Sequence, residues 1–229
     1  MGVEVHSTNC KAWASGGECR HDDIIVFSLS FEFVSQYYHH ATYEIVFKSR
    51  KNNDSWNDCL MSIDSTDFRI QQQGAVAKGN DFASFKLNGK SALRYEIGLD
   101  ILEGNLIWIQ GPYAAGKWTD ISIFRHCLIN HLDPYERVVA DKGYVGEAPQ
   151  FVKCPNSKTL RKEHQRMTRQ VSARHETINA RFKYWGILEE KYRHDMDVHG
   201  DVVVAVGVII QLTIENGEPL YKVEYDDIN

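Results

Sequence analysis

Three acidic residues, Asp64, Asp141 and Glu176, are the side chains of this sequence best placed to do chemistry. Asp64 lies inside residues 59–70, where apolar and polar residues alternate as in a half-buried strand. Asp141 directly follows the apolar run Val138–Ala140, and Glu176 lies in a long helical segment, with 34 residues between it and Asp141. Burying a carboxylate in such a place costs free energy unless a cation pairs with it, and the sequence shows no matching cation. They are therefore predicted to hold Mg²⁺ or Mn²⁺, which prefer oxygen ligands.

The pattern of the chain also predicts the elements that position these carboxylates. Strand character extends over residues 58–70, 92–101 and 104–112, and Glu103–Asn105 is predicted to be a hairpin turn between the last two. A further strand is expected over residues 136–141. Before this strand, a helix is expected from an N-cap at Thr119 to about His131, ended by Asp133-Pro134.

The helix that carries Glu176 can be tested by its spacing. One apolar face is predicted from residues at intervals of 4, 7, 4 and 3, namely Met167, Val171, Ile178, Phe182 and Trp185. Arg169, Glu176 and Lys183 are seven residues apart and share a face roughly opposite Ile178. On spacing alone, Glu176 is an exposed glutamate in ion pairs. Only its combination with Asp64 and Asp141 favours a metal ligand.

Several segments resemble motifs of the DDE transposases. Asp64-Ser65-Thr66-Asp67 resembles their DGT strand, Ala140–Gly146 resembles their ADKGY strand end, and His175–Lys183 resembles their glutamate helix. Ser65 departs from the usual glycine and leaves the carboxylate of Asp64 untouched. The segments that resemble the PIF/Harbinger branch in particular are Leu93–Gly98, Trp108–Tyr113, Trp118–Arg125 and Ile214–Leu220.

This resemblance covers roughly residues 55–227 and implies an RNase H-like fold, an α/β arrangement with a mixed central sheet flanked by helices. It divides the chain into an irregular N-terminal segment with a remnant helical region, residues 1–54, and a DDE endonuclease domain, residues 55–229. Residues 202–214 favour a strand by their valines and isoleucines, and a helix by their length. The resemblance favours a helix packed on the sheet.

The resemblance also implies an activity. Asp64, Asp141 and Glu176 would hold two divalent ions about 4 Å apart for hydrolysis of DNA phosphodiester bonds and for strand transfer. Transposases of this branch work in the nucleus with a separate Myb-like partner that binds DNA, and a homo-oligomer is a further expectation. The alternative is a domesticated, catalytically silent module that binds DNA or protein.

The charge distribution favours contact with DNA, although the net charge is −5. Residues 153–183 contain nine basic residues against two acidic ones, around the proposed catalytic glutamate. The competing interpretation is a solvated helix face. His175 is expected to neighbour DNA and not to act as a general base. The basic residues predicted to contact phosphates are Lys158, Arg161, Lys162, Arg166, Arg169 and Lys183.

Composition supports one well-packed intracellular domain. The chain has 229 residues with 43% hydrophobic content, and its start does not resemble a signal peptide. Its five cysteines are odd in number and lack CxxC spacing, which favours a reducing compartment. The apolar stretch Val202–Leu212 is about half as long as a bilayer crossing requires, so a buried element is expected.

Three other sets of residues compete with the acidic triad as candidate sites. Gly111–Lys117 is similar to a phosphate-binding loop, but Trp118 occupies the position that needs Ser or Thr, so nucleotide binding is not expected. Asp67 faces away from Asp64 in a strand and is predicted to be structural, while Asp120 is predicted to support a helix start or the active site. A zinc site is not expected from His6, Cys10, Cys19 and His21, because their spacings match no common zinc finger.

Overall fold

The computed structural model describes residues 59–71, 80–154 and 162–222 of the chain. The predicted N-terminal segment and the four candidate zinc ligands lie outside these ranges.

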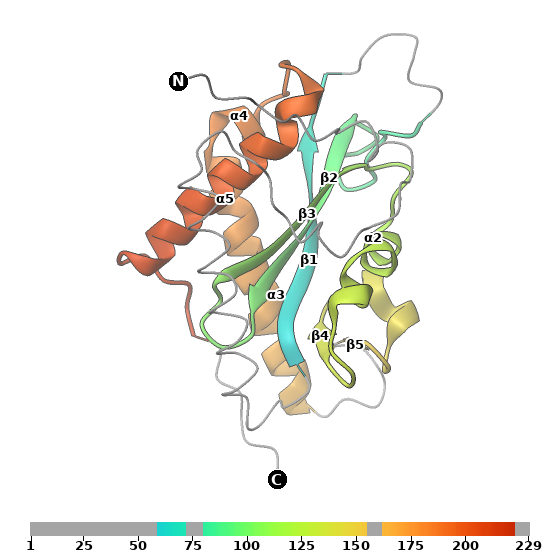
Figure 1. Cartoon of the computed structure of the whole chain (residues 1–229), viewed down its shortest axis with the longest axis vertical. Coiled ribbons are helices and arrows are strands. Elements are labelled where there is room, and N and C mark those ends of the chain that lie inside the picture. The colour runs from blue at the N-terminus through green and yellow to red at the C-terminus, as the bar shows by residue number, and fades with distance from the viewer. Residues whose placement is uncertain (1–58, 72–79, 155–161, 223–229) are drawn as a thin grey trace, which may run out of the picture.

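A five-stranded mixed sheet forms the centre of the molecule, with the strand order β3-β2-β1-β4-β5 (Figure 1). The first three strands along the chain are antiparallel neighbours, whereas β4 and β5 run parallel to β1. Four of the strands confirm the sequence prediction to within two residues, and the short β5 was not predicted. The bounds are β1 Cys59–Arg69, β2 Ala92–Asp100, β3 Leu106–Ala114, β4 Arg137–Val139 and β5 Val152–Lys153.

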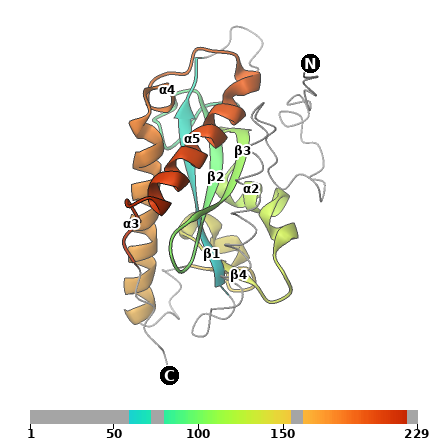
Figure 2. The same cartoon turned by 60° about the vertical axis from the view of Figure 1, so that its left-hand side comes forward.

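Helices cover both faces of this sheet. Figure 2 shows α3 and α5 on one face and α2 on the other. Thr119 caps α2 as predicted, because its side chain accepts a hydrogen bond from the backbone N–H of Ser122. The bounds are α2 Asp120–His126, η2 Leu128–His131, η3 Lys142–Glu147, α3 Lys162–Tyr184, α4 Gly186–Glu189, η4 Met196–Val198 and α5 His199–Glu215. This arrangement is the predicted RNase H-like fold.

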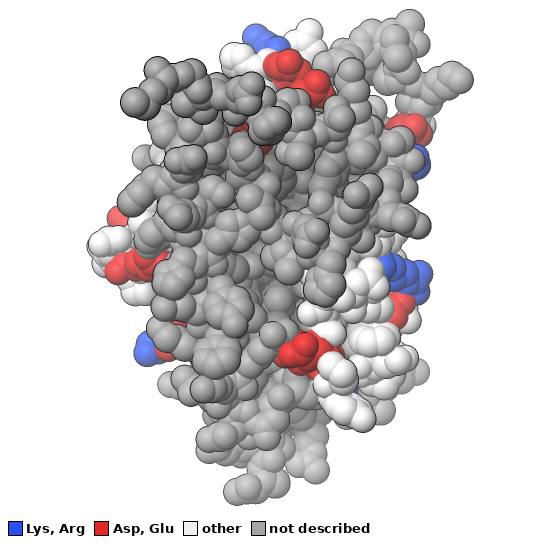
Figure 3. Space-filling view, in the orientation of Figure 1, with Lys and Arg blue, Asp and Glu red and all other residues white. Residues whose placement is uncertain are grey.

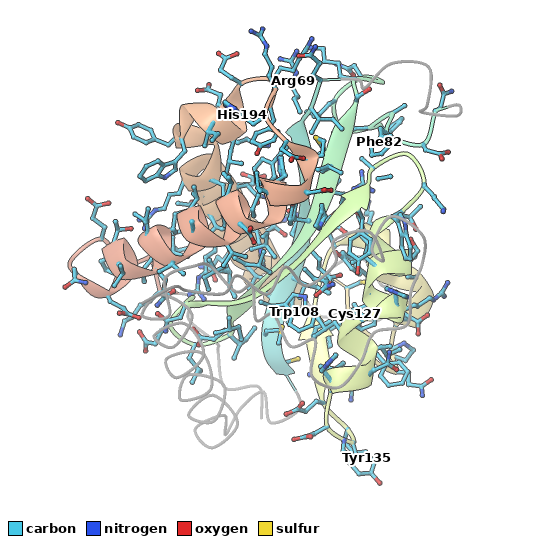
Figure 4. The ribbon with its side chains drawn as sticks, turned by 45° about the horizontal axis from the view of Figure 1, so that its top comes forward. Arg69, Phe82, Trp108, Cys127, Tyr135 and His194 are labelled. Carbon is cyan, nitrogen blue, oxygen red and sulfur yellow. The ribbon has the colours of Figure 1, made fainter. Side chains whose placement is uncertain are left out.

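Each face of the sheet has its own apolar core. On the face of α3 and α5, alternate residues of β1 and β2 such as Phe68 and Ile97 pack against Phe182 of α3. On the face of α2, the intervening residues of β1 join Trp108 and Cys127, which Figure 4 labels beside α2. From Met61 onward, the alternation of β1 therefore sends even-numbered residues, Asp64 among them, toward α3 and odd-numbered residues toward α2.

The apolar stretch over residues 202–214 forms α5, which confirms the predicted helix. Gly207 allows α5 to approach β3 closely, because a Cβ atom there would lie 2.5 Å from Ile109 Cδ1. Within the described part of the chain, Met196–Glu215 is the one helical stretch whose length and hydropathy would suffice to cross a bilayer, and 56% of its most apolar window is buried inside the fold. This burial agrees with the predicted buried element.

The geometry of Gly111–Lys117 differs from a phosphate-binding loop. Residues 111–114 belong to β3, which pairs antiparallel with β2. A phosphate-binding loop instead follows a strand of a parallel sheet. The structure therefore supports the expectation that this segment is not a nucleotide site.

Candidate active site

The pairing of β1 with β4 brings Asp64 and Asp141 to the same end of neighbouring strands. The two strands are parallel, and Ser62 of β1 is the register partner of Val139 of β4. Asp64 and Asp141 each lie two residues farther along, just beyond the end of this pairing. They are close enough for the charge of Asp64 to act on Asp141.

The backbone around Asp141 is held by its neighbours. Its Oδ1 accepts a hydrogen bond from the Gly143 N–H at 2.7 Å and caps η3, and its carbonyl oxygen accepts from Cys154 Sγ at 3.2 Å. A Cβ atom on Gly143 would lie 3.0 Å from both Asp141 Oδ1 and Asp120 Oδ2. Glycine at this position therefore lets the carboxylates of Asp120 and Asp141 lie on either side of it.

The local electrostatics favour the binding of a cation. Burial raises the pKa of Asp64, against the opposing effect of Lys86, and the charge of Asp120 raises it further. Burial also raises the pKa of Asp141, which is then raised by the charges of Asp64 and Asp120. The three carboxylates are thus close enough to destabilise one another's charged forms.

In the described part of the chain, Lys86 forms an ion pair with Asp64 that the sequence did not reveal. Its Nζ donates to the Ser65 carbonyl oxygen at 2.6 Å and to Ser65 Oγ at 2.9 Å. It lies 3.4 Å from Asp120 Oδ2 and 3.9 Å from Asp64 Oδ1. The expectation that no cation matches the acidic residues is therefore wrong. No periodicity links Lys86 to Asp64, because the lysine comes from the connection between β1 and β2.

Asp67 and Asp120 both belong to a network around Arg94. Asp67 is buried and receives two bonds from Arg94, at 2.7 and 2.8 Å, and one from Ser84 Oγ at 2.5 Å. This confirms the structural role predicted for Asp67. Asp120 lies 3.0 Å from Arg94 Nη1 and accepts a hydrogen bond from Ser65 Oγ. Asp120 therefore supports the site from the first turn of α2, and Ser65 uses the hydroxyl that distinguishes it from glycine.

A buried glutamate lies behind this network. Glu96 is the cross-strand partner of Ser65, so both side chains occupy the α2 face of the sheet. Its Oε2 accepts a hydrogen bond from Trp108 Nε1 at 3.0 Å, and Tyr144 is a second polar neighbour. Burial raises the pKa of Glu96 to about 8. Glu96 is thus protonated at neutral pH, which limits the negative charge of the region.

One turn of α3 crosses β1 at Asp64. His175 Nε2 lies 2.9 Å from Ser62 Oγ, and Asn179 Nδ2 donates to Asp64 Oδ2 at 3.2 Å. His175 is only 2% exposed, so the expectation that it neighbours DNA is wrong. The helix spacing of four residues between His175 and Asn179 turns both toward the sheet, which the sequence pattern of apolar residues did not reveal.

Glu176 lies in the same turn with an exposed side chain, as its helix face predicted. Its charge raises the pKa of Tyr221, so it lies near the chain that follows α5. Across the three described ranges, no three histidine, cysteine or acidic side chains approach closely enough to hold a metal ion. The structure therefore brings Asp64, Asp120 and Asp141 within range of one another's charges, whereas the exposed Glu176 lies on the turn of α3 that also carries Asn179.

The basic residues predicted to contact DNA divide into described and undescribed groups. On α3, Arg169 is exposed and Lys183 is half-buried. The side chains of Lys162 and Arg166 lie outside the described part, as do Lys158 and Arg161 altogether.

Two other cations of the same run have structural roles. Arg174 is fully buried and donates to the carbonyls of Ile101, Leu102 and Tyr221, and Arg181 donates to the carbonyl of Glu218 at 2.8 Å. The count of nine cations therefore overstates the charge that is free to meet phosphates. On the described part of the face in Figure 3, basic and acidic side chains are interspersed.

Comparison with known proteins agrees with this geometry. The family model described as DDE superfamily endonuclease matches residues 63–211. The match covers more than half of the chain and includes Asp64, Asp141 and Glu176. The chain belongs to the DDE superfamily of endonucleases. No curated protein and no solved structure matches it significantly. A nuclease of this superfamily acts on DNA, which is the activity class that the acidic pair on neighbouring strands suits.

Proposed function

We propose that this DDE superfamily endonuclease cleaves DNA phosphodiester bonds with divalent metal ions held by Asp64, Asp141 and Glu176. The observation that supports the proposal is the parallel β1–β4 pairing, whose last register partners, Ser62 and Val139, each lie two residues before an acidic residue of the proposed site. The donor set fits Mg²⁺ or Mn²⁺, because these ions prefer carboxylate oxygens. Burial raises the pKa of both Asp64 and Asp141, so a bound divalent cation would stabilise their charged forms.

The residues around the pair have supporting roles in this proposal. Asn179 orients the Asp64 carboxylate by donating to Oδ2, and Gly143 orients Asp141 through its N–H. Glu176 would supply the third carboxylate from the turn of α3 that crosses β1. When bound, the metal ions would lower the pKa of the attacking water or hydroxyl and stabilise the leaving oxygen. The protein otherwise contributes positioning and charge neutralisation.

Family membership supports the biological part of the proposal by analogy. We infer a transposase-like reaction of the Harbinger type, with nicking at element ends and strand transfer into target DNA. A Myb-like partner would supply sequence recognition, and the chain would act in the nucleus as a homo-oligomer. The exposed Arg169 and the half-buried Lys183 on α3 would contact the phosphate backbone.

A second candidate function is a catalytically silent module that binds DNA or protein. The observation in its favour is the exposed side chain of Glu176, which is not joined to the acidic pair. Such a module would keep the fold and the DNA contacts while lacking a complete ligand set.

The test combines metal titration with plasmid nicking. Calorimetric titration of Mn²⁺ should give a binding heat that is largely lost in Asp141→Asn, which retains an oxygen to cap η3. Glu189→Gln, an exposed change on α4, is the matched control and should titrate like the wild type. An unchanged heat in Asp141→Asn would refute the metal site. Metal binding without nicking of plasmid DNA would support the silent module.

A further inference from the structure

Lys86 occupies a central place among the acidic groups of the site. Its amine contacts two elements at once, the carbonyl and hydroxyl of Ser65 on β1 and the carboxylate of Asp120 at the start of α2. Asp64 is its most distant partner, at 3.9 Å. The lysine is therefore anchored on Ser65 and Asp120 and reaches toward Asp64.

The neighbouring cation cannot replace Lys86 in this role. Arg94 makes two hydrogen bonds to Asp67, which is 1% exposed at its side chain, so the charge of Arg94 is largely matched there. Arg94 also compensates Asp120, which lies 3.0 Å from its Nη1, so the carboxylates of Asp64 and Asp141 are the ones that depend on Lys86. Lys86 opposes the raised pKa of both Asp64 and Asp141.

The exposure of Lys86 allows its amine to move. Its side chain is 36% exposed, whereas that of Arg94 is 7% exposed. A flexible four-carbon stem with access to water can turn away from a carboxylate at little cost. The contact with Asp64, which is the longest, is the first that a competing cation would replace.

We propose that Lys86 is the resident cation of the active site, neutralising Asp64 and Asp120 in the metal-free protein and releasing Asp64 when a divalent ion binds. This inference rests on the proposed function, because it takes Asp64 and Asp141 as the metal-binding pair. Lys86 is a positioning residue in this role and has no direct part in the reaction. Ser65, which occupies the position of the usual glycine, provides a hydroxyl group that accepts a hydrogen bond from the Lys86 amine.

Loss of Lys86 should strengthen metal binding, because its positive charge repels the divalent ion. Removing one unit charge about 4 Å from a cation in a water-like medium changes the affinity about fivefold. Lys86→Met should therefore bind Mn²⁺ about fivefold tighter or more in calorimetric titration. Lys86→Arg, which keeps the charge, should remain close to the wild type. Lys90→Met removes an exposed lysine from the same connection and is the matched control.

Thermal unfolding gives a second readout. Without metal, Lys86→Met should melt at a lower temperature than the wild type, and saturating Mn²⁺ should narrow the difference. If Lys86→Met does not fold, Lys86→Gln retains a donor for the Ser65 carbonyl and serves the same test. Unchanged or weaker Mn²⁺ binding in the folded variant would overturn the inference. An unchanged heat in Asp141→Asn would instead refute the metal site itself, so the two failures are distinguishable.

Discussion

The side chains of Asp67 and Arg94 form an ion pair beside the candidate active site that is almost closed to water. Their side chains are 1% and 7% exposed, and Ser84 supplies a further hydrogen bond to Asp67. A buried pair adds little net stability compared with apolar residues, but removing one partner leaves a charge without compensation. The main effect of the pair on stability is therefore the large cost of removing one partner.

Arg94→Met is expected to lower the free energy of unfolding by about 3–5 kcal/mol, because it strands the buried carboxylate of Asp67. Urea unfolding followed by circular dichroism measures this loss. Arg125→Met breaks the ion pair with Glu147, where the arginine side chain is 54% exposed, and should cost no more than about 1 kcal/mol. Equal losses in the two variants would contradict the role given to burial.

Glu96 should make the fold less stable as the pH rises. Burial raises its folded pKa to about 8, above the ordinary value of 4.5, so the folded state holds a proton that the unfolded state has lost. This contribution is complete below pH 4.5 and is lost as the pH rises toward 8. Glu96→Gln, which stays neutral, should exceed the wild type in stability at pH 8 by a few kcal/mol. Urea unfolding at pH 5 and pH 8 checks this, and a pH-independent difference would contradict it.

Among the elements, α3 is positioned by polar contacts as well as by its apolar face. Val171, Ile178 and Phe182 are buried as the spacing predicted. The same spacing could not predict that His175 and Asn179 would meet β1, because polar residues in a helix are assigned to solvent unless a partner is known. The contact depends on the position of β1 in the sheet, which is tertiary information.

His175 should make the attachment of α3 sensitive to acid. Burial lowers its pKa to about 4, below the ordinary 6.5, so its stabilising effect is present above pH 6.5 and is lost as the pH falls through 4. His175→Gln keeps a donor for Ser62 without a titratable ring, so stability should decline less between pH 6.5 and 4. Burial also lowers the pKa of His199 to about 4, so His199 still contributes its own part of the loss of stability in acid. His194→Gln, at an exposed position, should leave the acid profile unchanged when unfolding is followed by fluorescence.

At the scale of the whole molecule, the net charge of −5 opposes association with DNA at long range. The isolated chain should bind DNA weakly and with little sequence preference through Arg169 and Lys183. Replacing both by alanine should flatten the salt dependence of binding by about one to two units, since each lost phosphate contact removes about 0.9. Lys117→Ala, at an exposed position in the turn after β3, is the control. Strong discrimination between two unrelated duplexes would contradict this prediction.

The order of elements was largely predictable from the sequence, whereas the detail of the site was not. Alternation in residues 59–70 and the turn at Gly104 depend on neighbours in the chain, and both were confirmed. The two-residue β5 is too short to leave a periodic pattern. Lys86 and Arg94 reach the acidic residues only through the folded sheet, so no local spacing could reveal them. The resemblance of the segments around Asp64, Asp141 and Glu176 to DDE transposase motifs grouped the three carboxylates, which local patterns alone could not do.

The two halves of the candidate site differ in how firmly the sheet secures them. Asp64 lies within an eleven-residue strand, whereas Asp141 follows a strand of three residues whose outer neighbour has two. Only a few backbone bonds, such as Val138 N–H to the Phe151 carbonyl at 2.9 Å, fasten that edge. Short edges open locally without global unfolding. Amide protons of Val138 and Ala140 should therefore exchange with deuterium before those of Tyr95 and Ile97. A ligand bridging Asp64 and Asp141 would slow that exchange, so occupancy would complete the folding of this edge.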